Sequence, residues 1–225
     1  MQAAVRPYLT PEEYLAFERE AETRSEYFNG EVFAMAGASL AHNQITANVV
    51  TALNSRFRGR PCRALASDMR VKVKQTTSYA YPDVVIICGQ PQFEDKHRDT
   101  LLNPTLLIEV LSSATERYDR GGKFGHYRTL ESLTDYVLIS QTEARVEHFS
   151  RQSAGAWLLN VYVGLEAVAP LPSIGCELSL TDVYDKVEFP APRTLPLRIV
   201  RERQSDYEYE DDAYASHFVY PENNS

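Results

Sequence analysis

Apolar residues along the chain follow the periods of both strands and helices. Unbroken apolar runs at about residues 83–88 and 105–111 predict two strands that are buried on both faces. Alternation over residues 69–74 predicts another strand, with one buried face and one wet, basic face. More strands are expected in the stretches DYVLIS, ARVEHFSR, WLLNVYV and VEFPAP.

The N-terminal part predicts a helix followed by a hairpin. The stretch TPEEYLAFERE begins with Thr10 as a capping residue and Pro11 in the first turn, and Glu13 can complete a capping box. The pair Asn29-Gly30 then separates two short apolar stretches, which is a strong signal for a hairpin turn.

Two further helices are expected between the strands. From Ser39 to about Phe57, apolar residues recur at helical spacing, and a third helix should occupy about residues 117–130. The alternation of these elements predicts an α/β domain, with a mixed β-sheet flanked by helices and additional antiparallel strands. We expect this domain over residues 1–192, followed by an acidic, mobile tail over residues 193–225.

The composition is that of a globular protein, with 44% hydrophobic and 24% charged residues in 225. No apolar run is long enough for a membrane span, and the N-terminus has no signal-peptide pattern. The three cysteines, Cys62, Cys88 and Cys176, are scattered and odd in number, so we expect no disulfide and a reducing compartment. These features together predict a cytoplasmic protein that does not associate with membranes.

The net charge of −8 argues against a nucleic-acid partner, but its distribution weakens that argument. Residues 204–225 hold six acids and no Lys or Arg, and without them 23 basic residues face 25 acidic ones. Within the body, the segment from Arg56 to Lys74 contains seven basic residues and one acid, Asp68. Such a patch either contacts phosphates or is a solvated face, and the sequence leaves both readings open.

Several common chemistries have no counterpart in the sequence. There is no GxSxG motif, which excludes an α/β-hydrolase nucleophile elbow. The five histidines are isolated, so no zinc site is predicted. The stretch RGGKFG lacks the spacing and the Ser or Thr of a phosphate-binding loop, and no dinucleotide fingerprint is present.

The two buried strands each carry a carboxylate, Asp83 and Glu109. If the strands pair near their like ends, the two side chains converge, and they repel each other unless a cation or a proton lies between them. Mg²⁺ takes oxygen ligands and is usually held by one or two carboxylates, with water and phosphate completing the shell. Lys123, on the predicted third helix, could then stabilise a phosphoryl transition state.

Ordinary structural roles compete with this interpretation. Asp83 could be a turn or cap residue, and Glu109 could pair with a core arginine. Glu26, ahead of the hairpin, is either a third carboxylate of the site or a surface residue. His42 is more often a hydrogen-bonded structural residue than a catalytic one, and Lys123 alone would be a solvated helix residue.

Six ordered segments resemble a known family. RSEYFNGEVFAMAG, AHNQITANVV, SDMRVKV, YPDVVIIC, LLIEVLSSATERYDRGGKFGHYRTLESLTDYVLIS and VEHFSR are similar to the Uma-two family of restriction endonucleases. That family is part of the PD-(D/E)xK nuclease superfamily. The resemblance extends from about Tyr8 to Phe189 and keeps the order of the family's motifs.

The resemblance implies a restriction-endonuclease-like core and an Mg²⁺-dependent phosphodiesterase site, in which Mn²⁺ could substitute. Pro82-Asp83 matches the PD of the motif and Glu109 its D/E, which makes Asp83 and Glu109 the expected metal ligands. The motif lysine is replaced by Leu111, and Lys123 matches the position to which some superfamily members have moved it. Glu26 matches a glutamate that often assists this site.

We therefore expect a metal-dependent endonuclease acting on DNA, with Asp83, Glu109, Lys123 and Glu26 as its catalytic residues. The alternatives are a nucleic-acid-binding module with a decayed site and a protein-interaction module that uses the acidic tail. A homodimer is also expected, because cutting both strands of a duplex benefits from two sites.

Overall fold

The computed structural model describes residues 8–191, and the predicted tail at 193–225 lies outside this part. Five α-helices are found there: α1 (Pro11–Glu20), α2 (Leu40–Arg56), α3 (Glu116–Tyr118), α4 (Phe124–Tyr127) and α5 (Leu180–Val183). A π-helical turn, Asp119–Lys123, joins α3 to α4 without a break. Three short 3₁₀ turns lie at Lys74–Thr76, Ser153–Gly155 and Pro172–Ile174. None of the helices described is long and apolar enough to cross a membrane.

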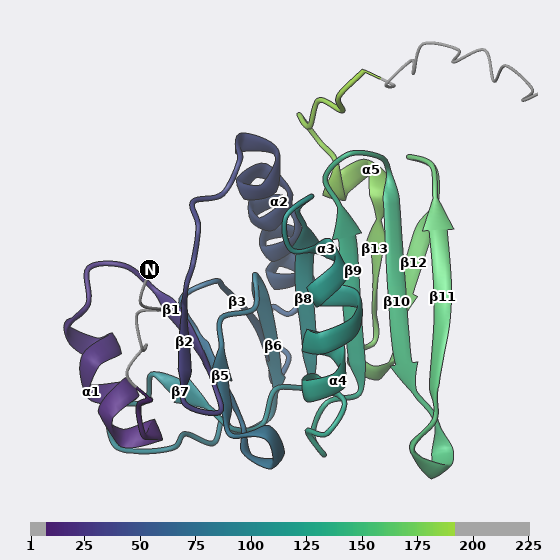
Figure 1. The fold of residues 1–225 in the computed structure, drawn as a ribbon. Coiled ribbons are helices and arrows are strands. Elements are labelled where there is room, and N and C mark those ends of the chain that lie inside the picture. The colour runs from purple at the N-terminus through teal and green to yellow at the C-terminus, as the bar shows by residue number, and fades with distance from the viewer. Residues whose placement is uncertain (1–7, 192–225) are drawn as a thin grey trace, which may run out of the picture. The chain divides into compact units, whose positions relative to one another are not determined.

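The strands form three sheets (Figure 1). The six-stranded sheet has the order β11-β10-β9-β8-β6-β3, from Trp157–Val163, Arg145–Arg151, Asp135–Ser140, Leu106–Leu111, Val84–Cys88 and Cys62–Ala66. The five-stranded sheet has the order β2-β1-β5-β4-β7, from Glu31–Ala34, Ser25–Phe28, Ser78–Ala80, Arg70–Val73 and Thr100–Leu101. Strands β12 (Val168–Leu171) and β13 (Cys176–Ser179) form a separate hairpin. Strands β8 and β9 run parallel and the other pairs of the six-stranded sheet antiparallel, so the sheet is mixed as predicted.

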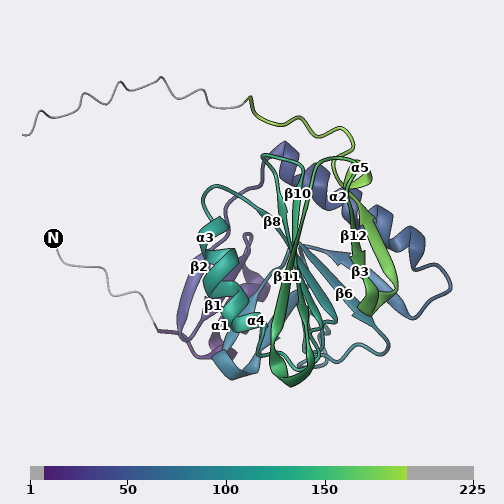
Figure 2. The same cartoon turned by 90° about the vertical axis from the view of Figure 1, so that its right-hand side faces the viewer.

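Both faces of the six-stranded sheet are covered (Figure 2). Helix α2, α5 and the β12–β13 hairpin pack on one face, against Val84, Ile86 and Ile108. The segment from α3 to α4 covers the other face, together with the adjoining sheet, against a second cluster that includes Leu107 and Tyr136. This double coverage explains the unbroken apolar runs of β6 and β8, because neighbouring residues on a strand point to opposite faces.

The predicted N-terminal elements are present. Thr10 and Glu13 form the capping box of α1, with Thr10 Oγ1 accepting from the Glu13 amide and the Glu13 carboxylate from the Thr10 amide. Asn29 and Gly30 form the hairpin turn between β1 and β2, both with positive φ. Helix α2 begins after Ser39, whose hydroxyl accepts a hydrogen bond from the His42 amide.

Two segments differ from their predicted structure. The third helix ends at Tyr127 rather than near residue 130, because the chain continues in turns closed by Leu130 N–H to Tyr127 O and Leu133 N–H to Leu130 O. The stretch VEFPAP forms no strand over its described residues: Val187 N–H bonds back to Tyr184 O, and proline cannot donate to a ladder.

The prediction of a wet, basic face on β4 is wrong. Arg70 is 2% exposed, and its guanidinium donates to Thr100 Oγ1 at 2.9 Å and to Tyr81 OH at 2.9 Å and pairs with Asp99 at 3.1 Å. Lys72 pairs with Glu94. The basic side chains of β4 thus bond to acids within the protein rather than face solvent, and Lys74, which follows the strand, is the exposed member of the predicted row.

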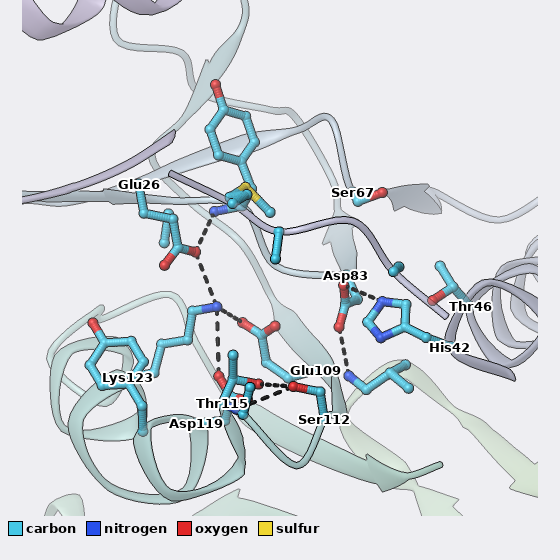
Figure 3. A pocket seen from close by; sticks show the side chains of 18 of the residues that line it. Glu26, His42, Thr46, Ser67, Asp83, Glu109, Ser112, Thr115, Asp119 and Lys123 are labelled. Carbon is cyan, nitrogen blue, oxygen red and sulfur yellow. Dashed lines mark hydrogen bonds and ion pairs between the residues drawn. The ribbon is translucent and has the colours of Figure 1, made fainter. Parts of the chain in front are cut away.

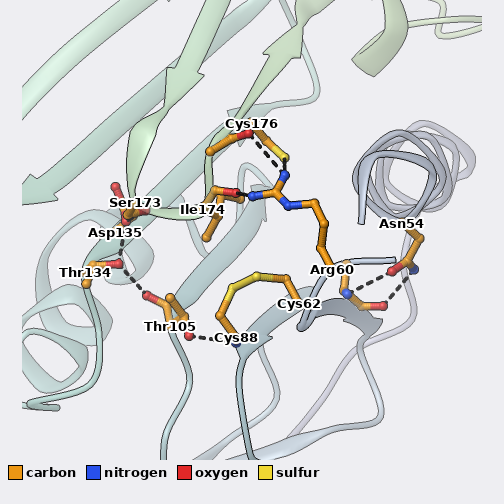
Figure 4. Close-up of a disulfide and its surroundings, with 12 residues drawn as sticks. Asn54, Arg60, Cys62, Cys88, Thr105, Thr134, Asp135, Ser173, Ile174 and Cys176 are labelled. Carbon is orange, nitrogen blue, oxygen red and sulfur yellow. Dashed lines mark hydrogen bonds between the residues drawn. A yellow bond between two sulfur atoms is a disulfide. The ribbon is translucent and has the colours of Figure 1, made fainter. Parts of the chain in front are cut away.

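The expectation that the cysteines form no disulfide is also wrong. Cys62 on β3 and Cys88 on β6 are register partners on neighbouring antiparallel strands and are joined by a disulfide (Figure 4). Cys176 is the free cysteine of the described residues. The cysteines therefore no longer support a reducing compartment, since disulfides persist where conditions are oxidising.

Removing this disulfide is expected to lower stability. The bond closes a loop with a sequence separation of 26 residues, for which the loss of chain entropy in the unfolded state corresponds to about 3 kcal/mol. The Cys62→Ala/Cys88→Ala variant should unfold at a clearly lower temperature than the wild type, whereas Cys176→Ala should not. Equal melting temperatures for the double variant and the oxidised wild type would contradict the cross-link.

Candidate active site

Asp83 and Glu109 lie next to each other because β6 and β8 are neighbours in the sheet. The register pairs Val84 with Ile108, so one more residue along the pair brings Asp83 opposite Glu109. The strands are antiparallel, and the start of β6 meets the later half of β8 rather than the like end that we expected. The two carboxylates nevertheless converge, as the sequence predicts.

Both oxygens of the Asp83 carboxylate have partners in the protein (Figure 3). Oδ2 accepts a hydrogen bond from the Val110 amide at 2.7 Å, and Oδ1 lies 2.9 Å from Nε2 of His42. Burial lowers the pKa of His42, but the hydrogen bond to Asp83 raises it above its ordinary value overall. The Ser39 cap fixes the first turn of α2, so His42 is held where it can orient the aspartate.

Lys123 lies at the centre of the cluster, with 10% of its side chain exposed. Its Nζ is 3.0 Å from Glu109 Oε1, 3.1 Å from Glu26 Oε1 and 3.7 Å from Asp119 Oδ1 (Figure 3). Burial favours the neutral amine, yet the surrounding carboxylates hold the pKa of Lys123 well above its ordinary value. The lysine is therefore a charged, buried group and not a solvated helix residue.

Glu109 is one of two almost fully buried carboxylates of the cluster, the other being Asp119. Glu109 is 3% exposed, and Tyr127 OH donates to its Oε1 at 3.1 Å. Burial raises the pKa of Glu109 well above its ordinary value, Lys123 opposes this shift, and the negative charge of Asp83 adds to it. The partner of Glu109 is thus a lysine from the covering helix and not the core arginine considered above.

Glu26 and Asp119 complete the group of acids. Glu26 on β1 accepts from the Tyr81 amide at 3.2 Å through the same Oε1 that faces Lys123, so it is part of the cluster and not a free surface residue. Asp119 was not among the predicted site residues. Burial raises its pKa. Its spacing to Lys123, four residues along one helical segment, was the available sequence signal.

The charges of the cluster do not balance. Four buried or half-buried carboxylates face one lysine and one histidine: Glu26, Asp83, Glu109 and Asp119 against Lys123 and His42. A divalent cation would offset the excess negative charge, and carboxylate oxygens are the ligands that Mg²⁺ prefers. Nowhere in residues 8–191 do three His, Cys, Asp or Glu side chains converge to hold a metal. An ion at this site would thus have at most two carboxylate ligands, Asp83 and Glu109, and would need water and substrate oxygens to complete its shell.

The cluster opens into a cleft of about 1500 Å³. The β1–β2 hairpin, the start of α2 and the segment from Ser112 to Tyr127 line it. The first two turns of α2 thus contribute His42 and Thr46, and the helical segment contributes Asp119 and Lys123 (Figure 3). A bound molecule in this cleft could approach the carboxylates and the lysine at the same time.

Two proteins of Synechocystis sp. (strain ATCC 27184 / PCC 6803 / Kazusa) are similar to this chain over most of their length. "Uncharacterized protein sll1609" is 39% identical over 167 residues, which is 74% of this chain and 94% of the relative. "Uncharacterized protein slr1290" is 34% identical over 183 residues, which is 81% of this chain and 95% of the relative.

A solved structure shares the fold. It is the "Crystal structure of a putative nuclease belonging to DUF820 from Anabaena variabilis ATCC 29413", with a TM-score of 0.65 and 22% identity. The match covers 78% of this chain and 97% of the other. The prediction of an α/β, restriction-endonuclease-like fold with a mixed sheet flanked by helices is thereby confirmed.

A family model extends the match to the sequence motifs. The Uma2 (Uma-two) model, described as "Putative restriction endonuclease", matches residues 11–182. This span contains Glu26, Asp83, Glu109 and Lys123. The chain therefore belongs to the Uma2 family of putative restriction endonucleases.

Proposed function

We propose that the protein is a metal-dependent endonuclease that hydrolyses phosphodiester bonds in DNA. The observation that carries the proposal is the placement of Lys123, whose Nζ lies 3.0 Å from Glu109 although the motif position itself holds Leu111. A lysine from the covering helix thus supplies the charge that the strand lacks. The proposal also places the protein in the cytoplasm, where DNA is accessible, although a disulfide such as Cys62–Cys88 is rare in that compartment.

Asp83 and Glu109 would hold the cation, Mg²⁺ or Mn²⁺. When bound, the ion polarises a phosphoryl oxygen and lowers the pKa of a coordinated water. His42 and the Val110 amide keep the Asp83 carboxylate in one orientation. These contacts preorganise the two ligands before substrate arrives.

Lys123 would act on the phosphate without being a metal ligand. Its ammonium is held by Glu26 and Glu109, lines the cleft and can donate a hydrogen bond to the attacking water or to a phosphate oxygen. Glu26, on β1, positions the ammonium of Lys123 from the five-stranded sheet. Asp119, in the same helical segment as Lys123, limits the movement of that ammonium. These residues therefore give a charged, oriented donor beside the metal ligands.

Hydrolysis by the wild-type protein tests the proposal. Supercoiled plasmid, linear duplex and single-stranded DNA are incubated with the protein in Mg²⁺, Mn²⁺ or EDTA. We expect cleavage of at least one substrate with either metal and none in EDTA. Tight metal binding without cleavage of any nucleic acid would contradict the enzyme and favour a decayed, nucleic-acid-binding module on the same fold.

A homodimer is part of the same proposal. Leu159, Val161 and Val163 alternate on one face of β11, are 43–60% exposed, and lie on an edge strand whose free hydrogen-bonding side can pair with an identical strand. Light scattering of the purified protein should give twice the chain mass, and Val161→Lys should halve it. A monomeric wild type would contradict the dimer.

A further inference from the structure

The cleft is poor in cationic side chains. Among the described residues that line the cleft, Arg24 is the one arginine and Lys123 the one lysine. Lys123 is buried among carboxylates, and Arg24 Nε lies 3.6 Å from Asp68 Oδ1. Six acids also line the cleft: Glu26, Asp68, Asp83, Glu109, Asp119 and Glu188. Duplex DNA presents two charged backbones, and proteins that bind it neutralise many phosphates, so this cleft is a poor match for a duplex.

Two exposed aromatic residues line the cleft, on elements that also carry residues of the catalytic cluster. Phe33 on β2 is 44% exposed and is the register partner of Glu26, so both side chains point to the same face of the hairpin. Tyr118 is 45% exposed and directly precedes Asp119. Both rings line the cleft. Exposed rings beside a phosphodiesterase site are suited to stacking with nucleobases.

Tyr118 is held by its contact with a glycine. A Cβ atom added to Gly122 would lie 2.7 Å from two carbons of the Tyr118 ring, so the ring packs directly on the helical backbone. This contact explains the glycine at 122, and 45% of Tyr118 remains exposed. Preorganisation of this kind lowers the entropic cost of binding a base.

Neutral hydrogen-bonding groups line the rest of the cleft. These groups include the amides and hydroxyls of Asn43, Thr46, Ser112, Ser113, Thr115 and Gln141. Some of them also bond within the protein, as Ser112 does with Thr115. The Thr46 hydroxyl is buried and has no hydrogen-bond partner among the described residues. Such groups can bond the edges of unpaired bases, which duplex DNA does not expose in this way. The volume of about 1500 Å³ also exceeds the roughly 300–1000 Å³ of small-molecule pockets.

We propose that the cleft takes an unpaired, single-stranded segment of nucleic acid, whose bases stack on Phe33 and Tyr118 while its backbone passes the carboxylates. The inference rests on the proposed nuclease function and narrows its substrate class. It assigns affinity to stacking and base contacts rather than to phosphate neutralisation. Binding should therefore depend only weakly on salt, with a slope of log affinity against log salt of about −1, as expected for one or two phosphate contacts.

Fluorescence anisotropy tests the inference with labelled single-stranded DNA, single-stranded RNA and duplex DNA of one sequence, in Ca²⁺ to prevent turnover. Phe33→Ala and Tyr118→Ala should each weaken single-strand binding about 10-fold, whereas Phe33→Tyr and Tyr118→Phe should retain it. Phe17→Ala is the matched control, since Phe17 is 52% exposed on α1 and does not line the cleft. The DNA and RNA arms decide which sugar is preferred.

The inference is overturned if duplex DNA binds as tightly as the single strand, if the two alanine variants bind like the Phe17→Ala control, or if no nucleic acid binds. The nuclease proposal fails separately. Aromatic-dependent binding of single strands without hydrolysis in Mg²⁺ or Mn²⁺ would overturn the enzyme and keep the substrate class. Hydrolysis of duplex DNA that neither alanine variant alters would keep the enzyme and overturn the substrate class.

Discussion

Asp83→Asn and Glu109→Gln are each expected to abolish hydrolysis and to remove the binding of one divalent ion per chain. Each substitution keeps the size of the side chain but replaces a charged ligand with a neutral amide, which binds Mg²⁺ poorly. The remaining carboxylate cannot hold the ion alone in a cluster whose other acids face Lys123. Calorimetric titration with Mg²⁺ and Mn²⁺, paired with a cleavage assay, measures both losses.

Glu109→Gln should destabilise the metal-free protein less than Lys123→Met does, because Lys123 keeps its ion pair with Glu26. Burial raises the pKa of Glu109, so its charge opposes folding at neutral pH, and Glu109→Gln relieves that cost. Glu18→Gln is a matched control. Glu18 is fully buried and accepts from the Ser25 amide and Tyr81 OH, away from the cleft. This control should lose stability and keep metal binding, and unchanged metal affinity in both site variants would place the metal site elsewhere.

Lys123→Met is expected to lower the rate of hydrolysis by about 100-fold or more, the scale of removing one positioned donor from a transition state. Methionine keeps most of the side-chain length and removes the charge. The metal ligands remain, so binding of Mn²⁺ should persist and should become tighter, because Glu26 and Glu109 lose their cation. The rate and the affinity thus move in opposite directions.

The same variant should also be less stable without metal. Breaking a buried ion pair by removing one partner costs about 3–5 kcal/mol, and added Mn²⁺ should restore part of this loss by binding to the folded state. Lys72→Met is the control, since Lys72 pairs with Glu94 outside the cleft. It should alter neither metal affinity nor rate. Hydrolysis at the wild-type rate in Lys123→Met would remove the lysine from the mechanism.

The parts of the fold that depend on local patterns could be predicted from the sequence. The capping box of α1, the Asn29-Gly30 turn and the apolar runs of β6 and β8 have signals that act within a few residues. The antiparallel pairing of β6 with β8 could not be predicted, because an apolar run has no direction. The Cys62–Cys88 bond depends on the register of β3 against β6 and was missed for the same reason.

The error at β4 has a different cause. Basic and apolar residues alternate in the same way in a strand with a solvated basic face and in a strand whose basic side chains pair with acids from distant segments. The pattern therefore cannot distinguish the two. Asp99 and Glu94 lie more than twenty residues after Arg70 and Lys72, on a segment that the alternation says nothing about. Burial of charge is thus decided by partners that the local pattern does not contain.

The convergence of Asp83 and Glu109 could be predicted from the sequence, but the surroundings of the two carboxylates could not. Asp83 and Glu109 could be singled out because each is a carboxylate at a buried strand, and Lys123 and Glu26 were candidates that the resemblance matched to family positions. Asp119 is part of no recognised motif. It joins the site because the helical segment that carries it packs over the sheet near β8. The aromatic rings of the cleft came together only through the hairpin register and the packing of Tyr118 on Gly122.

Anomalous diffraction from crystals soaked in Mn²⁺ tests the central claim most directly, because it locates the ion independently of any assay. The account predicts one Mn²⁺ per cleft, bonded to a carboxylate oxygen of Asp83 and one of Glu109 at about 2.0–2.2 Å, with Lys123 nearby but outside the coordination shell. An ion bound at other residues, or an empty cleft at millimolar Mn²⁺, would contradict it.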